Sequence, residues 1–178
     1  MGRVAGASRL GKQSVRNMML SLSVAVLFAG FIWLFLPHDG DKDPVLKPVD
    51  YRVELVTAQR AAPYPVAAPK GLDDEWRATS VRYRGSESHH WHLGFRSPDN
   101  RYVAVEQSTE KPRTFVERVT RGARDTGVTQ TVDGATWRKY EGERYDALVR
   151  TEDGATTVVL GSASFTRLGM MVGSLGAS

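Results

Sequence analysis

The chain of 178 residues carries a formal charge of +4 at pH 7 and contains no cysteine. The lack of cysteine excludes disulfide bonds and lipid attachment through a cysteine thiol. The net positive charge does not indicate nucleic-acid binding, because the excess of basic over acidic residues is confined to the start of the chain. Four basic residues and no acidic residue lie within residues 1–17, whereas the other 20 basic residues and all 20 acidic residues lie after residue 36.

An uncharged apolar segment occupies residues 18–36. As a helix that rises about 1.5 Å per residue, it is long enough to cross the hydrocarbon core of a bilayer. The basic residues before it favour a cytoplasmic N-terminus. No small-residue cleavage site follows Leu36, and the segment is longer than the apolar region of a signal peptide. We therefore expect an uncleaved signal anchor. The sequence predicts a single-pass protein of the cell membrane, N-in and C-out, with residues 1–17 as a cytoplasmic head.

Residues 37–50 combine three prolines with alternating charges, which is typical of an extended juxtamembrane linker. The remaining residues, 51–178, are numerous enough to form one extracytoplasmic domain around a core of its own. At the start of this domain we expect a short helix near residues 55–62. Three prolines then favour extended chain over residues 63–69.

The first strand-rich block of the domain begins after residue 76. Apolar residues alternate over residues 91–95, a turn follows at 97–100, and residues 102–106 continue as a second strand. This pattern predicts a β-hairpin. A helix is expected next, because Thr114 and Glu117 have the spacing of a capping box.

A second block follows the same plan. Residues 145–149 alternate like a strand, an Asp-Gly turn is expected at residues 153–154, and residues 156–160 form the return strand. Apolar residues at spacings of three and four over residues 165–175 predict a terminal helix.

The two blocks define the expected fold class. Their hairpins match at an offset of 54 residues, which aligns Phe95 with Val149. Each block is strand-rich and is closed by a helix. We therefore predict an α+β fold in which an antiparallel sheet carries its helices on one face.

The densest group of chemically active side chains is Glu87, His89, His90 and His92. On a strand, His90 and His92 point to the same face, so both imidazoles are placed to ligate one metal ion, with Glu87 or a group from a neighbouring strand completing the site. Trp91 points to the opposite, core-facing side. The favoured interpretation is therefore that the histidines lie on the exposed face of an ordinary strand, and a pH-sensitive contact between imidazoles is a further option.

Other motifs give little support for catalysis. Ser108 and Lys111 have the spacing found in penicillin-recognising enzymes, but Pro112 disfavours helix at Lys111 and the partner motifs are absent. The sequence also lacks the nucleophile elbow, the phosphate-binding loop and the zinc-protease motif. We expect no cofactor, and we expect binding in preference to catalysis.

A set of segments carries a family resemblance. The set consists of the basic head with the apolar segment, Ala61-Ala62-Pro63-Tyr64-Pro65-Val66, Trp91-His92-Leu93-Gly94-Phe95 with Ser97-Pro98-Asp99, Tyr102-Val103-Ala104-Val105, and a strand from Trp137 to Tyr140. Between Val15 and Leu175 the chain resembles an uncharacterised actinobacterial membrane-protein family, domain of unknown function 4245. The resemblance implies a membrane-anchored envelope protein, and it transfers no catalytic or binding residues.

The sequence thus favours a non-enzymatic binding or interaction module at the cell envelope. Its expected partner is an envelope protein or a cell-wall component, with no role for nucleic acid. The alternative is an envelope protein that binds a metal ion or a small molecule, hydrolytic or not, through the strand at His89–His92.

Overall fold

The computed structural model describes residues 18–19, 21–28, 31 and 49–177. The chain divides into two compact units, Met1–Val45 and Leu46–Ser178. In the first unit the described residues are helical. The predicted head, the rest of the predicted membrane segment and nearly all of the linker lie outside the described residues. Within the described residues, no helix combines the length and the apolar character needed to cross a membrane.

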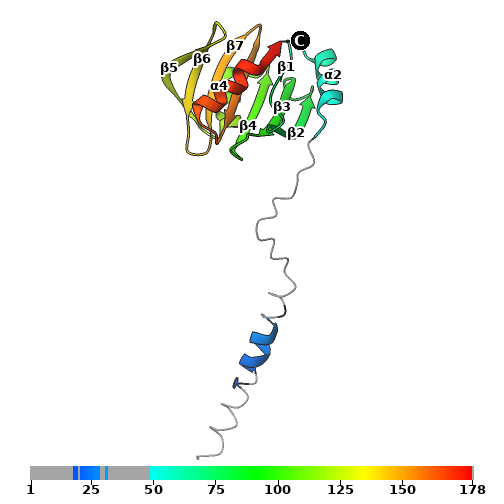
Figure 1. Ribbon diagram of the computed structural model, residues 1–178, viewed down its shortest axis with the longest axis vertical. Helices are drawn as coiled ribbons and strands as arrows, with labels where there is room; N and C mark the ends of the chain where they lie inside the picture. The colour runs from blue at the N-terminus through cyan, green and yellow to red at the C-terminus, as the bar shows by residue number, and fades with distance from the viewer. Residues whose placement is uncertain (1–17, 20, 29–30, 32–48, 178) are drawn as a thin grey trace, which may run out of the picture. The chain divides into compact units, whose positions relative to one another are not determined.

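The second unit is built on a seven-stranded antiparallel sheet (Figure 1). Its strands are β2 (Arg77–Arg84), β3 (His90–Arg96), β4 (Tyr102–Ser108), β5 (Arg124–Val132), β6 (Ala135–Glu141), β7 (Asp146–Glu152) and β8 (Ala155–Gly161). Their order in space is β2-β3-β4-β8-β7-β6-β5, so the two predicted hairpins meet at the central pair β4–β8. A separate two-stranded ribbon joins β1 (Ala67–Pro69) to β9 (Leu175–Ala177).

Helices cover both faces of this sheet. Figure 1 shows α4 (Phe165–Ser174) lying across the strands, and the core on that face also includes α2 (Arg52–Ala61) and β1. The opposite face packs against α3 (Pro112–Thr120) through Phe115 and Val116. The expectation of helices on one face is therefore wrong. Strand β4 explains why, because Val103 and Ala104 are both buried and point to opposite faces, so each face needs an apolar cover.

Both predicted hairpins and the helices that follow them are present. The second hairpin turns at Asp153 and Gly154, which have φ values of 50° and 75°, as Asp-Gly turns require. The two blocks are not equivalent in packing, however. Phe95 belongs to the core under α4, whereas Val149 belongs to the core under α3. The offset of 54 residues thus relates positions on opposite faces of the sheet.

The start of α3 differs from the predicted capping box. The helix begins at Pro112, and Lys111 precedes it with an extended backbone (ψ 126°) and no side-chain cap. Thr114 therefore lies inside the first turn. Proline is favoured at the first helical position because its fixed φ suits the helix and its missing N–H leaves no donor to satisfy.

Candidate functional site

His90 and His92 project from β3 toward the face covered by α3. Their side chains are 13% and 19% exposed. The ring of His90 meets the ring of Phe115 edge to face, with centroids 5.5 Å apart. The interpretation of these histidines as residues of an exposed strand face is therefore wrong, because α3 covers this part of the sheet. Trp91 faces the opposite core, as predicted.

Glu106 on the neighbouring strand β4 joins the two histidines. Its Oε2 atom lies 2.7 Å from His90 Nε2, and its Oε1 atom lies 2.7 Å from His92 Nδ1. Burial opposes ionisation of this carboxyl, but hydrogen bonds from both imidazoles outweigh that effect and lower the pKa of Glu106. An ionised carboxylate only accepts hydrogen bonds, so His90 Nε2 and His92 Nδ1 both carry hydrogen.

The outer nitrogen of His92 also has a partner. Ser80 Oγ on strand β2 lies 2.8 Å from His92 Nε2. When His92 is neutral and its Nδ1 carries hydrogen, Nε2 accepts the hydrogen bond from the Ser80 hydroxyl. Ser80, His92, Glu106 and His90 thus form one continuous hydrogen-bonded network across three strands, which we call the histidine network.

The other predicted site residues lie outside the histidine network. Glu87 pairs with Arg84, whose Nη1 atom lies 2.8 Å from Glu87 Oε2, and this hydrogen bond lowers the pKa of Glu87. His89 Nδ1 bonds to the hydroxyl of Tyr83 at 2.9 Å. The carboxylate that lies beside His90 and His92 is therefore that of Glu106 on the neighbouring strand, and not that of Glu87. In the part of the chain that the structure describes, no group of three or more histidine or acidic side chains is arranged to hold a metal ion.

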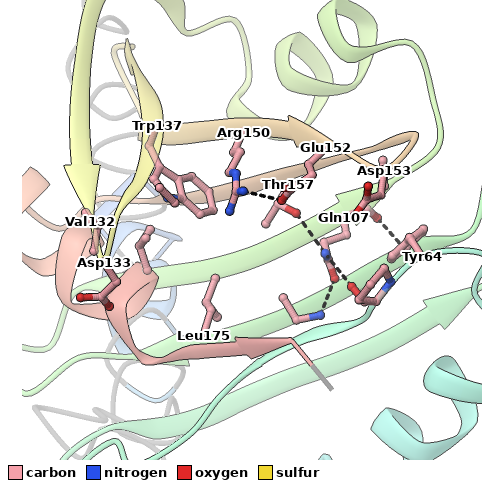
Figure 2. A pocket seen from close by; sticks show the side chains of 15 residues that line it. Tyr64, Gln107, Val132, Asp133, Trp137, Arg150, Glu152, Asp153, Thr157 and Leu175 are labelled. Atoms are coloured by element: carbon pink, nitrogen blue, oxygen red, sulfur yellow. Dashed lines mark hydrogen bonds and ion pairs between the residues drawn. The ribbon is translucent and has the colours of Figure 1, made fainter.

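A second region, on the face covered by α4, is a cavity of about 270 Å³ (Figure 2). Its walls come from strands β4, β5, β6, β7 and β8, from β1 and the segment that leads into it, and from α4 with β9. Val172 and Leu175 supply apolar surface. Trp137 and Arg150 lie close together on one side, and Gln107 and Tyr64 lie on the other. No sequence pattern predicted this cavity.

Most polar groups of the cavity wall have partners. Gln107 is buried, and its Oε1 atom accepts from the backbone N–H of Ala67 at 2.7 Å. Its Nε2 atom donates to the carbonyl oxygen of Pro65 at 3.2 Å and to Thr157 Oγ1 at 3.0 Å. Gln107 therefore fixes the segment before β1 against the sheet, and so holds one wall of the cavity in place.

Trp137 is different. Its side chain is 5% exposed, and its indole Nε1–H is buried without a hydrogen-bond acceptor. Among the described residues it is the one buried side-chain polar atom that has no partner. Nearby, Arg150 Nη2 pairs with Glu152 Oε2 at 2.6 Å, so the wall next to the indole offers both positive and negative charge.

Comparisons with known proteins place the chain in a family. Neither the curated proteins nor the solved structures contain a match to this chain. A family match covers residues 11–175, and so includes both helical and sheet-forming parts of the described chain. It is to the family described as Protein of unknown function (DUF4245), and the chain belongs to that family.

Proposed function

We propose that the chain is a single-pass membrane protein whose sheet-containing unit is a binding module on the outer face of the cell membrane. The uncharged segment 18–36 and the basic residues before it support this anchor and its N-in, C-out orientation. In the first unit, the large apolar side chains of the described helical residues are exposed, among them Leu27 and Phe28. Lipid is the environment that would cover such side chains.

The observation that carries the binding role is the unpaired indole N–H of Trp137 beside a cavity. A buried donor without an acceptor costs on the order of 1–3 kcal/mol. A ligand that shifts the wall enough to bring an oxygen atom to this N–H recovers that free energy. A concave site with apolar walls and a few polar groups is also the usual form of a small-molecule site.

The chemistry of the wall indicates the class of ligand. Arg150 offers donors, Glu152 offers acceptors, and the small exposed part of Trp137 adds aromatic surface. Hydroxyl groups both donate and accept, and a sugar ring also presents a carbon face to the apolar wall at Val172 and Leu175. We therefore propose that the cavity binds a saccharide unit of the cell wall.

Calorimetric titration of the full chain in lipid nanodiscs tests this role. Soluble disaccharide fragments of peptidoglycan are the probe. We expect binding to the native chain and at least fivefold weaker binding to Trp137→Phe. Trp76→Phe is the matched control, because Trp76 packs against Phe95 and is not part of the cavity wall. Absence of binding, or equal binding by the Trp137 variant, would contradict the proposal.

The orientation needs a separate experiment. A reporter that is active only outside the cytoplasm, fused after Ser178, is expected to be active in cells. An inactive reporter on a fusion protein that is present in the cells would overturn the N-in, C-out arrangement while leaving the cavity unaffected. The two parts of the proposed function are therefore tested independently.

A further inference from the structure

We infer that Ser80, His92 and Glu106 form a nucleophile, base and carboxylate relay that cleaves carboxylic esters on the face covered by α3. This activity is separate from binding in the cavity, which lies on the opposite face. Ser80 Oγ lies 2.8 Å from His92 Nε2, and Glu106 Oε1 lies 2.7 Å from His92 Nδ1. A hydroxyl on one ring nitrogen and a carboxylate on the other is the arrangement by which a histidine activates a serine.

An irregularity in β2 brings Ser80 to this position. The pairing of β2 with β3 shifts between Ala78, which pairs with Phe95, and Ser80, which pairs with Gly94. Without the shift, Ser80 would point to the same face as Ala78, toward the core under α4. The bulge turns Ser80 to the face of His92. Bulges that redirect a side chain are frequent beside active sites.

The carboxylate end of the relay is held on both sides. Glu106 is 6% exposed, and His90 Nε2 donates to its second oxygen at 2.7 Å. His90 in turn packs against Phe115 of α3. Glu106 and His90 therefore act as positioning residues: they orient His92 so that Nδ1 donates to Glu106 and Nε2 faces Ser80.

Gly94 leaves space beside the hydroxyl of Ser80, because it has no side chain. A Cβ atom at this residue would lie 2.5 Å from Ser80 Oγ and 3.3 Å from the Tyr102 hydroxyl oxygen. Both oxygens thus border the same small space, which a side chain at residue 94 would fill. Burial raises the pKa of Tyr102, so its hydroxyl stays protonated and is available as a donor to a developing oxyanion.

The reaction balances with water as the only co-reactant. Ser80 Oγ attacks the carbonyl carbon of the ester while its proton passes to His92 Nε2, and the carbonyl electron pair moves to oxygen beside Tyr102. Collapse of this intermediate breaks the ester C–O bond, and the leaving alcohol takes the proton from His92. Water then attacks the acyl-serine by the same route, which releases a carboxylic acid and restores the Ser80 hydroxyl.

Labelling with a fluorophosphonate probe tests the inference on the full chain in native membranes. Mass spectrometry is expected to find the adduct on Ser80. Labelling should be lost in Ser80→Ala and should be at least tenfold slower in His92→Gln. Ser86→Ala is the matched control, because Ser86 is an exposed serine in the turn after β2 and should leave the labelling of Ser80 unchanged.

The positioning role of Glu106 has its own readout. Glu106→Gln is expected to slow labelling of Ser80 at least tenfold, and Glu106→Asp is expected to restore part of the rate because it keeps the negative charge. No adduct on Ser80 in the native chain would overturn the inference. Equal labelling rates in the native chain and in His92→Gln would also overturn it, since Ser80 would then react without its base.

Discussion

The histidine network and the cavity lie on opposite faces of one sheet, and they differ in whether their buried polar atoms have hydrogen-bond partners. Adjacent residues of β4 show the contrast, because Glu106 points to one region and Gln107 to the other. In the histidine network, both carboxylate oxygens of Glu106 accept hydrogen bonds from imidazoles. In the cavity, Gln107 is fully bonded, but the indole N–H of Trp137 is buried without an acceptor.

This difference separates what each region contributes to stability. A buried carboxylate with two donors rigidifies its surroundings, and loss of any member leaves the others without partners. A buried donor without an acceptor lowers stability until something binds it. The hydrogen bonds of the histidine network are therefore complete within the fold, whereas the cavity wall contains a buried donor that has no acceptor among the described residues. Three substitution experiments sharpen this comparison.

The largest effect is expected for Glu106→Ala. Removal of the carboxylate leaves two imidazoles in a partly buried site without their acceptor, and breaking a buried ionic group in this way costs roughly 3–5 kcal/mol. The free energy of unfolding, measured with chemical denaturant, should fall by about that amount. Glu110→Ala is the control, because Glu110 pairs with Arg118 at the surface, where such pairs contribute roughly 0–1 kcal/mol. Equal losses in the two variants would show that the network does not stabilise the fold.

The pH dependence of stability gives the next effect. Hydrogen bonds from His90 and His92 lower the pKa of Glu106 below 4.5 in the folded state, against the opposing effect of burial. The unfolded chain then binds more protons than the folded chain, so stability present above pH 4.5 is lost as the pH falls through the lower, folded-state pKa. The melting temperature of the native chain should fall more steeply with acid than that of Glu106→Gln. Parallel curves for the two proteins would contradict the contribution of Glu106.

The hairpins could be predicted from the sequence because their signals are local. Alternating apolar residues and an Asp-Gly turn specify a hairpin wherever it packs. Strand β5 was missed because its residues are mostly exposed and polar, and Gly127, with φ 74°, interrupts its pairing with β6. An edge strand such as β5 buries one face at most, so its sequence contains no run of apolar residues from which a strand could be predicted.

The sites were harder to predict because they join segments far apart in the chain. The histidines were identified, but their partner Glu106 comes from the next strand and Ser80 from the previous one. One signal was present: Glu106 follows the apolar residues 103–105, and a charged residue at such a position is rarely buried without a partner. The cavity left no comparable signal, since Trp137 and Arg150 belong to different strands and neither lies in a recognisable motif.

The smallest effect distinguishes two buried tryptophans. Trp91 is fully buried and donates from Nε1 to the carbonyl oxygen of Ala67 at 3.0 Å, whereas the indole N–H of Trp137 has no acceptor. Replacement by phenylalanine removes the same atoms at both positions, so the lost volume is matched. Trp91→Phe also removes a hydrogen bond, and should therefore cost about 1 kcal/mol more than Trp137→Phe in the free energy of unfolding.

The same pair of variants links stability to binding. Without ligand, Trp137→Phe removes an unsatisfied donor, which offsets part of the cost of the smaller ring. With a saturating peptidoglycan disaccharide, the native chain should gain melting temperature and Trp137→Phe should gain less, because the ligand oxygen finds no N–H. Trp76→Phe, which lies outside the cavity wall, should gain as much as the native chain. Suppose that, without ligand, Trp137→Phe lowers the free energy of unfolding more than Trp91→Phe does. The indole N–H of Trp137 then has a hydrogen-bond partner within the fold, and the contrast between the two faces of the sheet is wrong.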